Sequence, residues 1–204
     1  MIRNAALMRK LVFVFTLIAQ SPIFCAGRTE PELPAAADRA ALPAPDADGF
    51  VALFNGHDLA GWTGLADYWS VKDGSISGHE TMEMSRQTFL ILSALKVTDF
   101  ELHFRYRFAS PDGNSAVQFR SVILDPKAYV VGGYQADLDA KALFDGSIYD
   151  EAGKAGNRGT KSSRGEKTNW DARNTRYVEP LALNGAELGA LIMPGSWNDA
   201  VLKV

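Results

Sequence analysis

Three segments of the chain alternate polar and apolar side chains, and their polar positions carry groups suited to binding and to proton transfer. They span residues 99–108, 115–121 and 133–138. The polar positions include His103, Arg105, Gln118, Arg120, Gln135 and Asp137. If the three segments are neighbouring strands of a curved sheet, these side chains form one polar face with both signs of charge. Such a face suits a sugar, whose hydroxyl groups need convergent donors and acceptors.

The elements that must position this face are β-strands. Alternation over residues 99–108 is typical of a half-buried antiparallel strand, and no window after the N-terminal segment has a long 3.6-residue apolar stripe. Turn signals are frequent; they are Asn55-Gly56, Asp73-Gly74, Asp112-Gly113, Gly132-Gly133 and Asp145-Gly146. Residues 68–77 therefore read as a tight hairpin. The pattern predicts an all-β sandwich or barrel, with Trp62 and Trp69 in its packing rather than as sugar platforms.

Composition excludes several classes of protein. Of 204 residues, 47% are hydrophobic and 22% charged, and the formal net charge is -3. These values exclude a disordered chain and a protein with many membrane spans. Beyond residue 27, 18 basic and 24 acidic residues remain, so the domain has no basic stripe and nucleic acid is not an expected partner.

The N-terminus is typical of an export signal. Arg3, Arg9 and Lys10 precede a short apolar run, and small residues end the segment at Gly27. We interpret residues 1–27 as a signal peptide, which places the mature protein in the periplasm or outside the cell, without membrane attachment. Residues 28–48 are rich in Pro and Ala and read as a linker. Cleavage after Gly27 removes the one cysteine, so neither disulfides nor a thiolate nucleophile are expected.

Seven ordered motifs carry a resemblance to a known family. They are GFVALFNGHDLAGW (49–62), WSVKDG (69–74), FEL (100–102), GNS (113–115), FRS (119–121), GYQAD (133–137) and GSIY (146–149). Together these resemble the 3-keto-disaccharide hydrolase domain family over residues 49–204. The resemblance implies a concanavalin A-like jelly-roll sandwich of antiparallel strands. Family members usually continue beyond residues 197–199 with further strands, so we expect a sandwich that lacks its last strands.

The resemblance also implies a substrate and a reaction. The substrate is a glycoside oxidised to a ketone at sugar C3, which acidifies the proton on C2. A base removes that proton, the aglycone leaves from C1, and water adds, so that the net result is hydrolysis. A divalent metal ion that polarises the ketone is left open as a cofactor.

Candidate roles follow from the polar residues that match the family's motifs. Asp137 is the first choice of base and His103 the alternative, Arg120 is the partner of the enolate, and Tyr149 or Glu151 supplies the acid. The expected substrate-binding residues are Asn114, Ser115, Gln118, Gln135 and Arg105. Two structural alternatives stay open: Arg120 and Asp137 form an ion pair, or His103 is a surface histidine.

Two other functions compete with the enzyme. A non-catalytic glycan-binding module can use the same sandwich, and an exported structural domain would have no cluster of titratable groups. Convergence of His103, Arg120, Gln135, Asp137 and Tyr149 on one cavity would favour the enzyme. Residues 154–168, which are rich in Gly and basic residues, read as an exposed loop beside the site.

Overall fold

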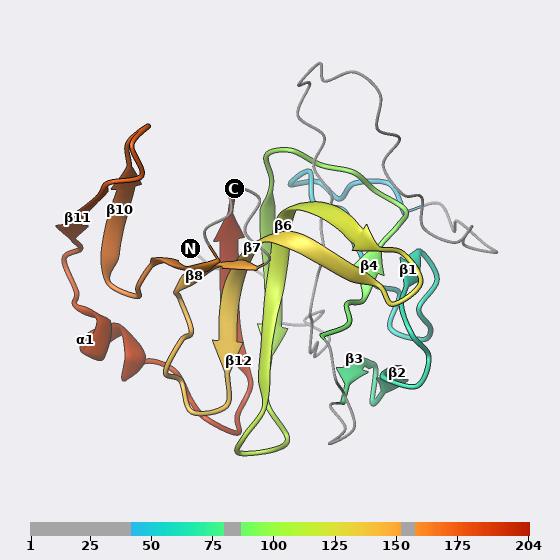
Figure 1. Cartoon of the computed structure of the whole chain (residues 1–204). Helices are drawn as coiled ribbons and strands as arrows, with labels where there is room; N and C mark the ends of the chain where they lie inside the picture. The colour runs from blue at the N-terminus through green and yellow to red at the C-terminus, as the bar shows by residue number, and fades with distance from the viewer. Residues whose placement is uncertain (1–41, 80–86, 152–157) are drawn as a thin grey trace, which may run out of the picture.

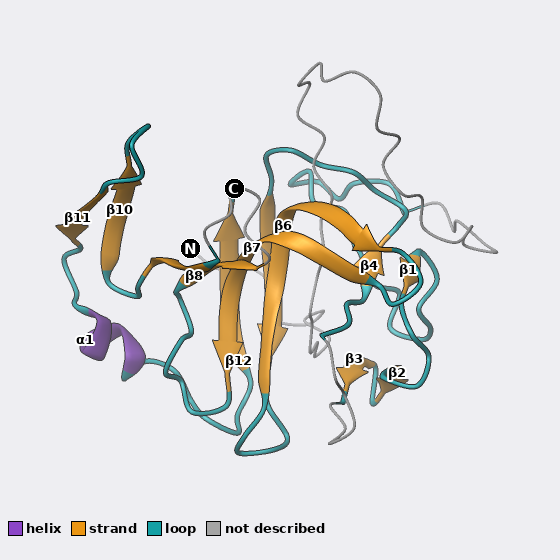
Figure 2. Ribbon diagram, viewed as in Figure 1, coloured by secondary structure: helices purple, strands orange, loops and turns teal. Residues whose placement is uncertain are grey.

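A computed structural model of the chain describes residues 42–79, 87–151 and 158–204 (Figure 1). Its strands are β1 (Trp62–Thr63), β2 (Trp69–Lys72), β3 (Ser75–Gly78), β4 (Ile91–Leu92), β5 (Glu101–Tyr106), β6 (Asn114–Asp125), β7 (Val130–Asp139), β8 (Ile148–Glu151), β9 (Gly159–Ser162), β10 (Glu166–Trp170), β11 (Arg176–Pro180) and β12 (Asn198–Lys203). In these ranges the one helix is α1 (Gly185–Gly189), purple in Figure 2. The prediction of an all-β sandwich is confirmed.

The predicted signal peptide and most of the predicted linker lie outside the described residues. Within the described ranges, no helix has the length and apolar character needed to cross a membrane.

The largest sheet is antiparallel and has the strand order β6-β7-β8-β9. The two predicted strands at 115–121 and 133–138 lie within β6 and β7, which pair directly, as the alternation predicted. Their register shifts between Phe119 and Val122, where Arg120 has a φ of +47°. An extra residue in one strand bends a sheet, and Figure 2 shows β6 and β7 curving together.

The strand at 99–108 has a different neighbour from the one expected. It forms β5, which pairs with β12, so that His103 faces Val201 and Arg105 faces Asp199 across the ladder. The hydrophobic core explains the arrangement, because Leu102, Phe104 and Tyr106 of β5 pack in one cluster with Val117 of β6 and Leu138 of β7. The prediction that β5 continues the polar face of β6 and β7 is therefore wrong. Its polar side lies on the opposite side of β5 from the core.

The same core holds both tryptophans named in the sequence. Trp62 and Trp69 are buried in the cluster, and Trp62 Nε1 donates to the Leu53 carbonyl at 2.7 Å. Their predicted packing role is confirmed. The hairpin prediction is confirmed as well: β2 pairs with β3 through Asp73 and Gly74, whose φ values of +50° and +68° suit a two-residue turn.

The segment 154–168 is not only a loop. Its described part contains β9, which pairs with β8 at the edge of the main sheet, and the start of β10. Residues 152–157 lie outside the described ranges. The β10–β11 hairpin and α1 lie at one side of the molecule, across the main sheet from β1 to β4 (Figure 1). Arg164 connects α1 to the loop between β7 and β8, since it donates to carbonyls of Gly185, Ala142 and Asp145.

Candidate active site

One face of the main sheet collects most of the predicted polar residues. Directly opposed residues in an antiparallel pair project to the same side, so the register identifies this face. Ala116 is paired with Asp137, Gln118 with Gln135, and Gln135 with Tyr149. The predicted residues on this side are Asn114, Gln118, Gln135, Asp137, Tyr149 and Glu151. We call it the Asp137 face; the opposite side of β6 and β7 contributes Val117 and Leu138 to the core.

Asp137 is half-buried, and its neighbours make its carboxyl group hard to ionise. Burial raises the pKa of Asp137 to about 7, and the negative charges of Asp139, Glu151 and Asp145 contribute to the same rise. A carboxyl group with this pKa is divided between its two protonation states at neutral pH. That balance suits a general base, which must be ionised but still basic.

Asp139 and Asp145 hold the conformation of the loop beside Asp137 by accepting hydrogen bonds from its backbone. The Asp139 carboxylate accepts from the backbone N–H groups of Lys141 at 2.9 Å and Phe144 at 2.6 Å. Asp145, which is 3% exposed, accepts from the Asp139 N–H at 3.0 Å and from the Tyr106 hydroxyl. The sequence analysis assigned Asp145 only to a turn and missed Tyr106, because this contact spans 39 residues and leaves no local pattern.

These carboxylates do not form a set suited to a metal ion. The oxygens of Asp139 and Asp145 already accept hydrogen bonds from the protein. Among the residues that the structure describes, no three His, Cys, Asp or Glu side chains are grouped as metal ligands.

Arg158 joins the two candidate acids. Its Nη2 lies 2.7 Å from Glu151 Oε1, and its guanidinium carbon is 6.0 Å from the centroid of the Tyr149 ring. Glu151 is buried and Tyr149 half-buried, whereas the Arg158 side chain is exposed. The sequence analysis placed the basic segment 154–168 beside the site, but it did not single out Arg158.

Gln118 is the most deeply buried residue of the Asp137 face. It is 0% exposed, and within the described residues neither its amide nitrogen nor its amide oxygen has a hydrogen-bond partner. Gln135, directly opposite on β7, is 8% exposed. Buried amides are ordinarily hydrogen-bonded, so the two amide atoms of Gln118 are free to bond a polar partner.

Two predicted site residues lie on β5, away from this face. His103 Nε2 lies 2.6 Å from Glu101 Oε1, and the imidazole packs on Phe50 with the ring centroids 4.6 Å apart. Arg105 pairs with Asp199 at 2.8 Å. Placing them beside Asp137 was wrong, because the core side of β5 packs on the side of β6 and β7 opposite Asp137, and His103 and Arg105 lie on the other side of β5. His103 is the surface histidine that the sequence analysis kept as the alternative.

Two more predicted residues also point elsewhere. Ser115 is opposite Leu138, on the core side of the sheet. Arg120, in the bulge, donates to Asp99 Oδ1 at 2.7 Å, and this is a different ion pair from the expected one with Asp137.

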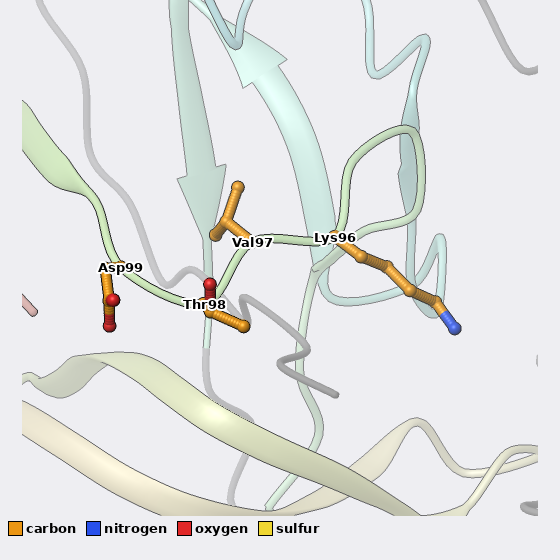
Figure 3. A pocket seen from close by; sticks show the side chains of 4 residues that line it. All are labelled: Lys96, Val97, Thr98 and Asp99. Carbon is orange, nitrogen blue, oxygen red and sulfur yellow. The ribbon is translucent and has the colours of Figure 1, made fainter. Parts of the chain in front are cut away.

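Asp99 is part of a pocket of about 370 Å³, whose described lining is residues 96–99. In Figure 3 the Lys96 side chain extends away from Asp99. Of the five residues expected on one cavity, Gln135, Asp137 and Tyr149 lie together on the Asp137 face, whereas His103 and Arg120 lie elsewhere.

Comparison with known protein families shows to which family the chain belongs. The 3-keto-alpha-glucoside-1,2-lyase-like domain matches residues 49–204. The chain belongs to this family. It is the 3-keto-disaccharide hydrolase family that the seven motifs resemble, and its name describes cleavage of 3-keto sugars. None of the curated proteins compared with the chain matches it.

Two of the family's motifs contribute residues to the Asp137 face. The 3-keto-disaccharide hydrolase motif GYQAD ends at Asp137 and contains Gln135, and the motif GSIY ends at Tyr149. The register brings these two motifs together, since Gln135 and Tyr149 are direct partners across β7 and β8. These two motifs therefore meet on the Asp137 face.

Proposed function

We propose that the protein cleaves 3-keto-glycosides by removing the proton from sugar C2. The observation that carries the proposal is Asp137, a half-buried carboxyl group surrounded by the charges of Asp139, Asp145 and Glu151. A C3 ketone makes the neighbouring C2 proton acidic enough for a carboxylate base. Family membership supports a glycoside oxidised at C3 as the substrate.

The reaction balances with two groups on this face. Asp137 takes the C2 proton and leaves an enolate, and the electrons then expel the aglycone oxygen from C1. Arg158 contacts both Glu151 and Tyr149, and we assign the proton donor for the leaving oxygen to Tyr149, because its hydroxyl carries a proton that the ion-paired Glu151 carboxylate does not. Water adds to C1 of the resulting enone, and C2 regains a proton, which gives a free 3-keto sugar.

The test is release of 3-keto-glucose from a 3-keto-glucoside by the purified chain. We expect Asp137→Asn to lose at least 100-fold in kcat, since general-base catalysis is worth about 10²–10⁴-fold. Asp112→Asn is the matched control. Asp112 is an exposed aspartate paired with Lys141 at 2.8 Å, outside the Asp137 face, so that variant should keep full activity.

Three results would change the assignment. A folded wild type that binds glycans but releases no product would favour the glycan-binding module. An active Asp137→Asn variant would move the base to another residue. Loss of release in a chelator, restored by a divalent ion, would require a metal that the described carboxylates do not provide for.

We also propose that the protein acts in the periplasm or outside the cell. Support comes from the basic and apolar pattern of residues 1–27, which is typical of a cleaved signal. The intact mass of the protein purified from its source tests this directly. A mass that lacks the first 27 residues supports export, and a mass that retains them contradicts it.

A further inference from the structure

The pairing of β8 with β9 brings one cation to two side chains of β8. The ladder between these strands ends with Asp150 opposite Gly159. Arg158 precedes that glycine and so comes beside Glu151, the next residue of β8. Its Nη2 lies 2.7 Å from Glu151 Oε1, and its guanidinium carbon lies 6.0 Å from the centroid of the Tyr149 ring. Arg158 therefore reaches the carboxylate and the phenol at once.

Arg158 reaches these groups from the solvent side. Its side chain is 59% exposed, whereas that of Glu151 is 11% exposed. The negative charges of Glu151 and of Tyr149 both raise the pKa of Arg158, and hydrogen bonds to both side chains contribute. The guanidinium thus interacts with the phenol as well as with its ion-pair partner, and the interaction is strongest when the phenol oxygen carries charge.

The contact with Arg158 leaves the proton of the Tyr149 hydroxyl free. This step rests on the proposed function, in which Tyr149 protonates the leaving oxygen. A phenol oxygen can accept a hydrogen bond while its O–H donates another, and a guanidinium group only donates. Arg158 can therefore bond the oxygen of Tyr149 without competing for its hydrogen. That hydrogen stays available for the aglycone.

We infer that Arg158 is a positioning residue that acts through Tyr149 and stabilises the charge its oxygen gains during proton transfer. As the bond between C1 and the aglycone oxygen breaks, Tyr149 gives its proton to that oxygen and becomes a phenolate. Water returns a proton to the phenolate before the next turnover. A guanidinium group stays charged throughout this cycle. A fixed cation beside an oxygen that gains charge lowers the barrier of the step.

The experiment compares two substrates that differ in their need for an acid. Methanol leaves from methyl 3-keto-glucoside only with a proton, whereas 4-nitrophenolate leaves from 4-nitrophenyl 3-keto-glucoside without one. The full chain is given each substrate, and kcat/KM is measured by release of 3-keto-glucose. Arg158→Gln is the test variant, and Tyr149→Phe removes the acid itself. Arg176→Gln is the matched control, because Arg176 on β11 also pairs with a glutamate, Glu166.

We expect Arg158→Gln to lower kcat/KM for the methyl substrate at least about tenfold and to leave the 4-nitrophenyl substrate nearly unaffected. Tyr149→Phe should show the same selective loss, and the control should show none. A purely structural role of Arg158 would slow both substrates by the same factor. That outcome, or no loss for the methyl substrate, would overturn the inference.

A second variant keeps the test valid if the first does not fold. Removing Arg158 alone leaves the buried Glu151 carboxylate without its cation, which is destabilising. In Arg158→Gln/Glu151→Gln two neutral amides replace the ion pair, and we expect the same selective loss for the methyl substrate.

The inference and the proposed function fail in different ways. If the unmutated chain cleaves neither substrate, the proposed function fails and the inference fails with it. If it cleaves both, and both Arg158 variants keep the wild-type ratio of the two kcat/KM values, the proposed function stands and only the role of Arg158 is overturned.

Discussion

Tyr106 on β5 donates its hydroxyl hydrogen bond to the carboxylate of Asp145, in the loop between β7 and β8. Both side chains are buried, and Asp145 also accepts from the Asp139 N–H. The contact connects the β5–β12 pair to the loop that holds negative charge beside Asp137. Burial raises the pKa of Asp145, and burial together with Asp145 raises the pKa of the Tyr106 hydroxyl.

Removing this hydroxyl should destabilise the fold. Tyr106→Phe leaves the buried Asp145 carboxylate with one donor fewer, and we expect a loss of about 1–3 kcal/mol in the free energy of unfolding. Urea denaturation measures it. Tyr177→Phe is the control, because Tyr177 is exposed and its hydroxyl reaches Asp171 at only 3.3 Å. A loss of equal size in both variants would contradict the structural role of the Tyr106 contact.

Asp137 should make stability depend on pH. Its pKa is about 7 in the folded chain, against an ordinary value of 3.8. Between these values the folded state holds a proton that the unfolded state has released, so stability falls as pH rises from about 4 to about 7. Denaturation of the wild type and Asp137→Asn across this range should show a decline that is smaller in the variant. Identical profiles would show that the carboxyl group titrates normally.

Gly133 should resist substitution because of the strand beside it. A Cβ on Gly133 would lie 2.8 Å from the Phe119 carbonyl oxygen and 2.9 Å from the Ser121 Cα, both backbone atoms of β6. We expect Gly133→Ala to cost about 1–3 kcal/mol through this overlap, in addition to the cost of its φ of +150°. Thermal unfolding measures the total.

Gly159→Ala provides the matched comparison. Gly159 has a similar φ of +140°, but among the described residues a Cβ there meets no atom within 4 Å. The difference between the two variants therefore isolates the close approach of β6 to β7. Equal destabilisation would mean that backbone conformation alone makes glycine necessary at residue 133.

Arg164 should hold the Asp139–Asp145 loop against α1. Its Nε donates to the Gly185 carbonyl at 2.7 Å, and its Nη1 donates to Ala142 at 2.8 Å and Asp145 at 3.0 Å. Lysine cannot reproduce this planar set of donors, so we expect Arg164→Lys to cost about 2 kcal/mol. Hydrogen exchange should also become faster in residues 142–146.

An exposed arginine supplies the control for that substitution. Arg173→Lys changes a residue that is exposed in the turn between β10 and β11. It should leave both stability and exchange unchanged. Unchanged exchange in Arg164→Lys would contradict the proposed connection between the loop and α1.

Local patterns predicted the parts of the fold that depend on local chemistry. Asp73 and Gly74 adopt positive φ values in the turn, which Asp and Gly tolerate, so the β2–β3 hairpin could be predicted from residues 68–77. Alternation placed Gln118 and Gln135 on one face, because β6 and β7 are paired strands close together in the sequence.

Long-range pairing is what the sequence could not reveal. Alternation tells which side chains share a face of β5 but not which strand lies beside it, and its partner β12 comes almost 100 residues later. His103 and Arg105 were misplaced for that reason. Arg120 was misplaced because a bulge changes the alternation within β6 and directs this side chain to Asp99. Tyr106 was missed because alternation assigns it only to the core.

The central claim is that Asp137 removes the C2 proton, and exchange of that proton tests it most directly. A 3-keto-glucoside is incubated with the protein in deuterated buffer, and the C2 position of substrate and product is followed by proton NMR. We predict that the wild type and Asp112→Asn label C2 with deuterium as they release the sugar, and that Asp137→Asn labels it at least 100-fold more slowly. Labelling by Asp137→Asn at the wild-type rate would contradict the account.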